Sequence, residues 1–202
     1  MKKNLFIFLL GFAAQAYSAS GHDALQLKLN AIRSMTAHFN QVVKAQKREV
    51  SRSSGTMALL RPGHFRWQTQ DPLAQLVIAD GRHLWIYDID LEQVTVKKQD
   101  KALDGAAGLF LSGYNDTLAR DFDVTVNIEG SKNYFDLHAK SSKTNFQRVK
   151  LMFDGEALTG IELFDQLGQD TDVHLDTIKL NPTLVNTLFE FKIPKGVDVV
   201  EQ

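Results

Sequence analysis

Apolar and polar side chains alternate along much of the chain. In residues 122–128 the apolar positions are Phe122, Val124, Val126 and Ile128, and the positions between them are polar. Successive side chains of a strand point to opposite faces of a sheet, so this alternation predicts an antiparallel strand with one buried face. The same period of two recurs at 135–139, 149–153, 161–163 and 173–175. Turn signals return about every 8–12 residues, which predicts a body of about eleven strands.

Two stretches depart from this rhythm and favour helix. Asp23 is the expected N-cap of a first helix, and Leu25, Leu29 and Ile32 follow at i, i+4 and i+7, on one stripe. Residues 100–119 are mostly apolar and predict one or two short helices inserted into the sheet. An insert that joins two halves of a meander has to lie across a sheet face or a barrel mouth. Together with the first helix, we expect it to form a cover.

The N-terminus has the layout of a secretory signal peptide. Two lysines precede a compact apolar run at 5–14, and small residues follow it. The run is too short for a stable transmembrane anchor. A buried N-terminal helix is the less favoured alternative, because nothing caps the segment. We therefore expect a signal peptide at 1–18, cut within 16–20, and a single domain over 19–202.

Charge and cysteine content exclude several classes of function. The chain has 202 residues, with 23 Lys and Arg against 24 Asp and Glu, a net charge of −1. A surface without basic excess gives no reason to expect nucleic acid as a partner. The absence of cysteine excludes disulfides, thiolate metal sites, a cysteine nucleophile and a lipid anchor on cysteine. The mature protein is therefore expected to be exported and not itself lipidated.

No pattern for catalysis stands out. None of the six histidines has another at the i, i+4 spacing of a helical zinc site, and no G-x-S-x-G or phosphate-binding glycine motif occurs. Asp-x-Asp pairs at 88 and 90, 121 and 123, and 170 and 172 fall at turns or on strand faces that point to water. We expect no catalytic residues, no metal and no cofactor, and hence a protein that is not an enzyme.

Large apolar side chains are concentrated in residues 59–87. Phe65 and Trp67 share one face of a predicted strand, whereas residues 84–87 are apolar on both faces. A strand that is apolar on both faces is expected to be buried on both faces, each packed against another part of the protein or a ligand. Two interpretations remain open, a filled core and a cavity lined for an apolar ligand, and the pattern does not distinguish them.

Several motifs in this region resemble one family. Residues 55–67, G-T-M-A-L-L-R-P-G-H-F-R-W, contain the R-P-x-x-F-x-W signature of the periplasmic lipoprotein carriers, the LolA family. Residues 76–87 resemble its next motif, an apolar run with D-G and W-x-Y, which L-E-Q-V-T follows at 91–95. F-N-Q at 39–41, F-E-F at 189–191 and P-K-G-V at 194–197 are similar to its two ends. The segment 100–119 matches in apolar character only, and 127–181 mainly in strand rhythm.

The resemblance implies a mainly β (α+β) fold, an incomplete, strongly curved antiparallel β-barrel of about eleven strands under a short-helix lid. It implies a periplasmic, monomeric chaperone of a Gram-negative bacterium that binds the acyl chains of outer-membrane lipoproteins. Its partners would be an inner-membrane ABC-type release complex and a lipid-anchored receptor on the outer membrane. The alternatives are a sensing module of the same fold that binds lipid or protein without shuttling, and, third, a lipid-processing hydrolase.

The resemblance also implies roles for single residues. Arg61 matches the signature arginine, which holds the lid shut through bonds to its backbone carbonyls, whereas the residue alone suggests a solvent-facing arginine at a strand end. The expected lining of the acyl-chain site is a set of large apolar side chains: Leu59, Phe65, Trp67, Ile78, Trp85, Tyr87, Leu109, Phe110, Phe135 and Phe153.

Overall fold

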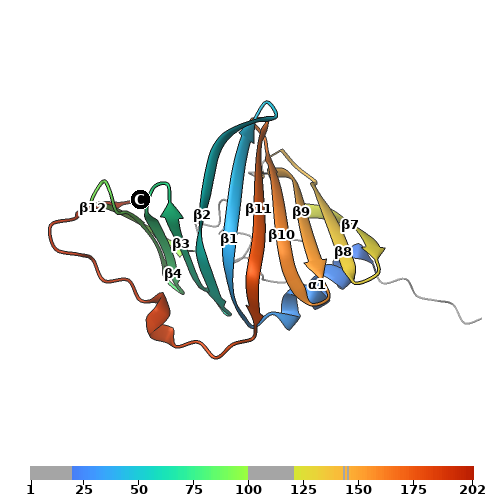
Figure 1. Ribbon diagram of the computed structural model, residues 1–202, viewed down its shortest axis with the longest axis horizontal. Coiled ribbons are helices and arrows are strands. Elements are labelled where there is room, and N and C mark those ends of the chain that lie inside the picture. The colour runs from blue at the N-terminus through green and yellow to red at the C-terminus, as the bar shows by residue number, and fades with distance from the viewer. Residues whose placement is uncertain (1–19, 100–120, 143, 145) are drawn as a thin grey trace, which may run out of the picture.

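The computed structural model describes residues 20–99, 121–142, 144 and 146–202, which form one sheet, one α-helix and a short 3-10 turn (Figure 1). The helix is α1 (Gly21–Ala31) and the turn is η2 (Asn186–Phe189). The strands are β1 (Ser34–Ala45), β2 (Arg48–Leu60), β3 (His64–Asp71), β4 (Gln75–Asp80), β5 (His83–Asp88), β6 (Gln93–Lys98), β7 (Phe122–Glu129), β8 (Lys132–Ala139), β9 (Phe146–Asp154), β10 (Ala157–Asp165), β11 (Gln169–Leu180) and β12 (Asp198–Glu201).

The twelve strands form an open, curled sheet. Their order is β12-β6-β5-β4-β3-β2-β1-β11-β10-β9-β8-β7, so the sheet does not close on itself. Every neighbouring pair is antiparallel except β12 and β6. The long strands β1 and β2 lie at its centre, and the sheet bends away from them on both sides (Figure 1). This confirms the predicted incomplete barrel, with the short parallel strand β12 added to the antiparallel set.

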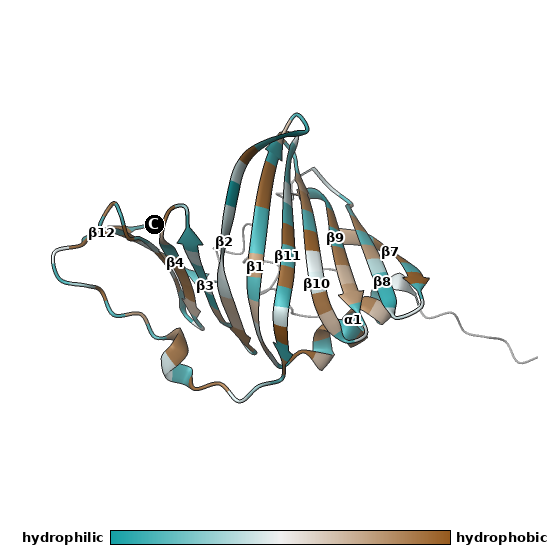
Figure 2. Cartoon of the chain, viewed as in Figure 1, coloured by the Kyte–Doolittle hydropathy of each residue, from teal (hydrophilic) through white to brown (hydrophobic). Residues whose placement is uncertain are grey.

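The alternation of side chains positions the core (Figure 2). In β9, for example, Val149, Leu151 and Phe153 are buried and the residues between them are not. Most buried apolar side chains form one cluster on a single face of the sheet, which we call the inner face. The opposite, outer face carries mainly polar side chains on β7 to β11, because period-two strands with one buried face leave the other face to solvent.

Helix α1 covers part of the inner face. Leu25 and Leu29 point into the cluster, as predicted. The N-cap is Ser20 and not Asp23: the Ser20 hydroxyl oxygen accepts the Asp23 backbone N–H at 3.2 Å and donates to the Asp23 carboxylate at 2.8 Å. Asp23 therefore lies in the first turn, where a carboxylate interacts favourably with the helix dipole.

The helix also approaches the far side of the sheet closely. A Cβ atom added to Gly21 would lie 2.5 Å from the carbonyl oxygen of Val124 in β7. Only a residue without a Cβ allows the start of α1 to lie this near the backbone of β7.

Strand β11 contains a bulge that the pattern did not predict. Val173 and Leu175 face inward, and so do Ile178 and Leu180, which are out of phase with them. The extra residue is Thr177, with φ of 52°, and the pairing register with β1 shifts at the same place. A bulge of this kind restores the inward direction of the apolar side chains after the shift.

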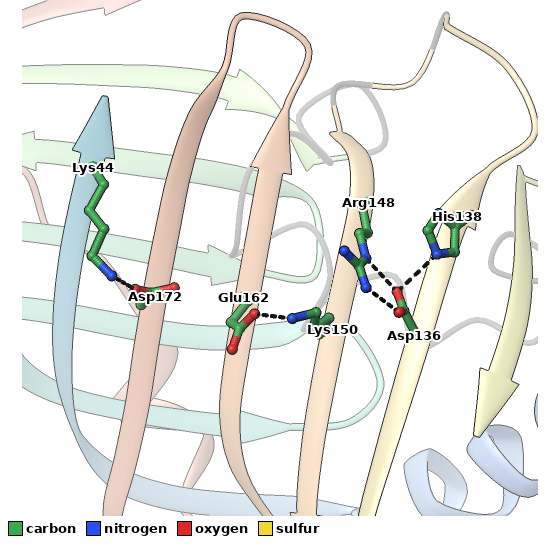
Figure 3. A network of polar contacts seen from close by, with 7 residues as sticks. All are labelled: Lys44, Asp136, His138, Arg148, Lys150, Glu162 and Asp172. Atoms are coloured by element: carbon green, nitrogen blue, oxygen red, sulfur yellow. Dashed lines mark hydrogen bonds and ion pairs between the residues drawn. The ribbon is translucent and has the colours of Figure 1, made fainter. Parts of the chain in front are cut away.

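The outer face of the second half carries a network of charged side chains (Figure 3). Lys150 contacts Glu162 at 2.8 Å, and Arg148 holds the Asp136 carboxylate through two hydrogen bonds. His138 lies 3.3 Å from the same carboxylate. Neighbouring strands are thereby linked by side chains as well as by their backbones.

Two of the predicted segments lie outside the described residues, namely the signal peptide at 1–18 and the helical insert at 100–119. Residues 100–120 connect β6 to β7, which stand near opposite ends of the strand order. Over the described ranges, no helix has the length and apolar character needed to cross a bilayer.

Candidate functional site

One wall of the inner face is built by β2 and β3. Leu59 pairs directly with Phe65, and Met57 pairs with Trp67, so these four side chains stand on the same face of the two strands. The rings of Phe65 and Trp67 lie 6.0 Å apart, and Phe39 of β1 stacks on Trp67 at 3.7 Å between ring centroids. The result is a continuous aromatic surface.

This stacking depends on a glycine in β2. A Cβ at Gly55 would lie 1.9 Å from the backbone oxygen of Gln68 and 2.9 Å from the ring of Phe39. The pairing register between β2 and β3 also shifts beside Gly55. The glycine therefore lets β2 bend and lets the Phe39 ring lie over the backbone.

The opposite wall is built by β8 to β11. Phe135 faces Leu151 across the β8–β9 pair, and Leu151 in turn faces Ile161 of β10. The ring of Phe153 meets that of Phe135 edge-on, with 5.7 Å between centroids. Both walls belong to one cluster of buried side chains.

Five predicted lining residues therefore meet on one surface: Leu59, Phe65, Trp67, Phe135 and Phe153. Phe65 is 0% exposed and Phe153 2%, whereas Trp67 is half-buried. Four of the five side chains are buried and Trp67 is half-buried, so a ligand would reach most of this surface only if the packing around it changed. Leu109 and Phe110 lie outside the described residues.

The other three predicted lining residues lie on the opposite face. In the paired strands Ile78 aligns with Arg66 and Trp85, and Tyr87 is two residues from Trp85 on the same strand. Trp85 and Tyr87 contact Phe191, at 5.4 and 5.9 Å between ring centroids. Ile78, Trp85 and Tyr87 are thus apart from the other five. Since residues 84–87 are apolar on both faces, the pattern did not reveal which face was inner.

The cover on that outer face is the segment 181–197, which we call the C-terminal strap. It leaves the base of β11 and runs past β3 and β4 to β12 (Figure 1). Asn181 fixes its start: the side-chain oxygen accepts the Arg33 backbone N–H at 2.8 Å and its amide donates to the Ala31 carbonyl at 3.0 Å. Phe189 then contacts the ring of His64 in β3 at 5.6 Å between centroids, and Phe191 contacts Trp85 and Tyr87 in β5.

The D-G-x-x-x-W sequence at residues 80–85 has a structural explanation. Asp80 accepts backbone N–H groups of Arg82 and His83 at 2.8 and 2.7 Å, and its second oxygen accepts the Trp85 indole N–H at 2.9 Å. Burial raises the pKa of Asp80, but these hydrogen bonds outweigh it and the pKa lies below its usual range. The carboxylate therefore fixes both the β4–β5 turn and the indole ring of Trp85.

Arg61 lies in the turn between β2 and β3. It is half-buried, and its backbone N–H donates to the carbonyl of Arg33 at 2.8 Å, next to the end of α1. Gln99, at the end of the described part of this half, donates to the Gly63 carbonyl at 2.8 Å and accepts the Gly81 N–H at 2.9 Å. The turn that carries Arg61 therefore lies beside the point where residues 100–120 begin.

Several inner-face residues were not predicted as lining. Phe39, Met57, Val77 and Ile86 all belong to the inner cluster or pack against it. A signal was available for Phe39, since it begins the F-N-Q motif. Val77 and Ile86 become recognisable only when the register of β4 and β5 is known.

The chemistry of the inner face is apolar. Ser34 is the single polar residue in the described ranges that is buried, and its hydroxyl donates to the Pro182 carbonyl at 2.6 Å, away from the aromatic walls. Among the same residues, no three His, Asp or Glu side chains are grouped so as to hold a metal ion. The face therefore offers a ligand dispersion and hydrophobic contact, with no polar anchor from a buried side chain.

Sequence comparisons with known proteins identify one family. The sequence model of a family described as "Outer membrane lipoprotein carrier protein LolA" matches residues 30–192. A curated protein of Legionella pneumophila (strain Corby), named outer-membrane lipoprotein carrier protein, is 60% identical over 202 residues, which is 100% of both chains. A protein of the same name from Azotobacter vinelandii (strain DJ / ATCC BAA-1303) is 34% identical, over 97% of this chain and 98% of the relative.

Solved structures show the same fold at low identity. An uncharacterized conserved protein from Thermus thermophilus aligns with a TM-score of 0.59 at 12% identity, over 89% of this chain and 99% of that chain. The Pseudomonas aeruginosa MucA/MucB complex contains a chain that aligns with a TM-score of 0.52 at 15% identity, over 85% of this chain and 61% of that chain.

Proposed function

This chain belongs to the LolA family of outer-membrane lipoprotein carrier proteins, and we propose that its apolar inner face holds the acyl chains of the lipoprotein it carries. The observation that carries this proposal is the single apolar cluster that joins the two walls of the curled sheet. In this interpretation Leu59, Phe65, Trp67, Phe135 and Phe153 contact cargo. Ile78, Trp85 and Tyr87 support the sheet from behind.

The energetics of the cargo explain why a carrier is needed. Each CH₂ group buried from water contributes about 0.8 kcal/mol, so several acyl chains in water cost on the order of tens of kcal/mol. Free diffusion between two membranes is excluded at that cost. A face without buried polar anchors covers the chains and can still release them, because no specific hydrogen bond has to be broken.

Release requires a closure that opens reversibly, and we propose Arg61 as its latch. The latch would act on backbone carbonyls of residues 100–119. Its position in the β2–β3 turn, beside Gln99, supports this role. A charge-assisted hydrogen bond contributes roughly 1.5–3 kcal/mol, which cargo or a partner can outweigh.

The remaining assignments follow from the carrier role. We propose that residues 1–18 are a signal peptide and that the mature protein works as a monomer in the periplasm. It would take cargo from an inner-membrane ABC-type release complex and hand it to a lipid-anchored receptor on the outer membrane. In this proposal the protein binds and transfers cargo, with no catalytic step and no cofactor.

The test of the site is loading of an acylated lipoprotein. The purified protein is expected to form a soluble one-to-one complex with it, and Phe65→Glu is expected to abolish the complex because a charge would enter the aromatic wall. Since Phe65 is fully buried, folding is checked by circular dichroism, and Trp67→Gln at a half-buried position provides a second variant. Leu167→Glu, at a residue that is 94% exposed, is the matched control.

The outcomes separate the classes of function. If folded Phe65→Glu and Trp67→Gln both bound the lipoprotein as the wild type does, the aromatic wall would not be part of the binding site. A complex that keeps its cargo in the presence of acceptor membranes would indicate a sensing module. Release of free fatty acid would indicate a hydrolase.

The latch is tested separately with Arg61→Leu. This variant is expected to fold and to bind cargo, but to change the rate at which cargo passes to acceptor membranes. Arg52→Leu, an exposed arginine at the far end of β2, is the control. Transfer at the unchanged rate by the Arg61 variant would show that the arginine does not control closure.

A further inference from the structure

A groove of about 420 Å³ lies on the outer face, on the side of the sheet opposite the aromatic walls. Strands β11, β1, β2 and β3 form its floor, and Leu188 of the C-terminal strap borders it. Its charged side chains are Arg66 and Lys179, both cations, and the imidazole of His38 adds a third basic group.

The central feature of the groove is a half-buried arginine without an acidic partner. One amino group of Arg66 donates to the Leu188 carbonyl at 3.4 Å, and the other donates to the Gln68 side chain at 3.0 Å. No ion pair to Arg66 occurs within the described part of the chain. Burial lowers the pKa of the guanidinium, because its charge is partly removed from water.

The acid beside the groove is already engaged. Asp176 precedes the lining residue Thr177 and accepts hydrogen bonds from Asn40 at 3.2 Å and from the Thr177 hydroxyl at 2.8 Å, with His38 at 3.9 Å. Asp176 forms no ion pair with Arg66 among the described residues. The bulge at Thr177 places this residue on the outer face directly after Asp176, so that its side chain lines the groove.

The remaining lining suits a polypeptide ligand. Thr36, Thr56 and Thr177 surround the cations with hydroxyl groups, which both donate and accept hydrogen bonds. Phosphate groups are commonly held by clusters of arginines or by several backbone N–H groups. Here a single guanidinium fork, a lysine and neutral hydroxyls match a carboxylate and the backbone next to it.

We propose that this groove binds a carboxylate on an acidic segment of a partner protein, with Arg66 contacting the carboxylate directly and Lys179 supplying the second positive charge. The site is distinct from the acyl-chain face, because the sheet separates the two. A partner bound here leaves the inner face accessible, so cargo and partner can be held at the same time.

The experiment is an NMR titration of the full-length mature protein with glutarate, a small dicarboxylate. We expect saturable shifts of the backbone amides of Thr56, Arg66 and Lys179. Arg66→Gln and Lys179→Gln should each weaken binding, the former by about tenfold or more, as expected for loss of a charge-assisted hydrogen bond of roughly 1.5–3 kcal/mol. Arg52→Gln, a paired arginine on the same strand as Thr56, should bind as the wild type does.

Parallel titrations with sodium phosphate and sodium chloride at equal ionic strength separate the sources of negative charge. Tighter binding of phosphate than of glutarate would overturn the proposal in favour of a phosphate or lipid-headgroup site. The proposal would be overturned altogether if glutarate caused no larger amide shifts than chloride does, or if Arg66→Gln showed the same glutarate shifts as the wild type. Loading of lipoprotein is measured in the same variants: it should stay normal, and this keeps a failure here distinct from a failure of the carrier role.

Discussion

At the scale of single residues, two positions show how backbone geometry sets the shape of the aromatic wall and of the groove. Gly55 lies where a Cβ atom would meet both the β3 backbone and the Phe39 ring. Thr177 adopts a left-handed conformation that β-branched residues rarely occupy. The first position requires the smallest residue, whereas the second carries a residue that is poorly suited to its backbone.

Gly55→Ala is expected to destabilise the protein. The new methyl group would lie 1.9 Å from the Gln68 carbonyl oxygen, so β2 or β3 must shift and the Phe39–Trp67 stack must loosen. Overpacking of this kind costs roughly 1–3 kcal/mol. Thermal unfolding measures it, and Ser51→Ala, which introduces an alanine at an exposed position of the same strand, is the control. A melting temperature for Gly55→Ala equal to that of wild type would contradict the close approach.

Thr177→Gly is expected to stabilise the protein. A non-glycine residue in the left-handed region costs about 1–3 kcal/mol, and a glycine in a strand costs roughly 0.5–1 kcal/mol of backbone entropy, so a net gain of about 1 kcal/mol remains. Urea unfolding measures it. Thr125→Gly in β7, a threonine outside any bulge, should destabilise instead, and a loss of stability in both variants would show that Thr177 is not strained.

At the scale of elements, the strands follow the alternation of side chains closely, and the exceptions have local causes. The β1–β2 turn has Gln46 and Lys47 at φ of 50° and 65° with no glycine, so it lacks the usual signal. The bulge in β11 inverts the period without a glycine to mark it. Strand β12 has four residues and pairs in parallel with β6, a contact between distant segments that local patterns do not contain.

The charge network on β8 to β10 is predicted to make stability depend on pH. The pKa of Asp136 lies below its usual range, mainly because Arg148 donates hydrogen bonds to the carboxylate. Partial burial opposes this shift, whereas the charges of Arg148, His138 and Lys150 add to it. In the unfolded chain an aspartate ionises near its ordinary value of about 3.9. The stabilisation is therefore present above that value and is lost as pH falls through the lower pKa of the folded state.

Asp136→Asn should accordingly lower the free energy of unfolding at pH 7, and the difference from wild type should shrink as the pH falls below the ordinary aspartate value of about 3.9 and through the lower folded-state pKa. Urea unfolding at a series of pH values measures it. Asp123→Asn on β7, whose carboxylate is largely exposed and lies 3.7 Å from Lys140, is the control and should have little effect. A difference for Asp136→Asn that stays constant across this range would rule out the ionised carboxylate as its cause.

At the scale of the whole molecule, the sheet separates two apolar regions, the inner cluster and the contact with the C-terminal strap. The resemblance of motifs predicted the curled sheet and the carrier family, and five of the eight described lining candidates meet on the inner face. The face of Ile78, Trp85 and Tyr87 was not predictable, because it depends on the strap, which arrives from about a hundred residues further along the chain.

The separation predicts different responses of the two tryptophans to cargo. Trp67 lies on the inner face and Trp85 beneath the strap, and the chain contains no others. With Trp85→Phe, loading of lipoprotein should shift the Trp67 fluorescence to shorter wavelength and saturate at one cargo per protein. In the Trp67→Phe variant, loading of lipoprotein should leave the emission of Trp85 unchanged. A cargo-dependent shift of Trp85 alone would place the acyl chains on the wrong face.

The pairing of β12 with β6 and the contact of α1 with β7 affect the tendency of the protein to aggregate at high concentration. An uncovered outermost strand is a template on which further copies can add, and such growth ends in fibres or precipitate. Here one edge of the open sheet is a strand of only four residues, and the start of α1 lies against the backbone of the strand at the other edge. The sheet can thus remain open at both edges while offering little unpaired backbone to another copy.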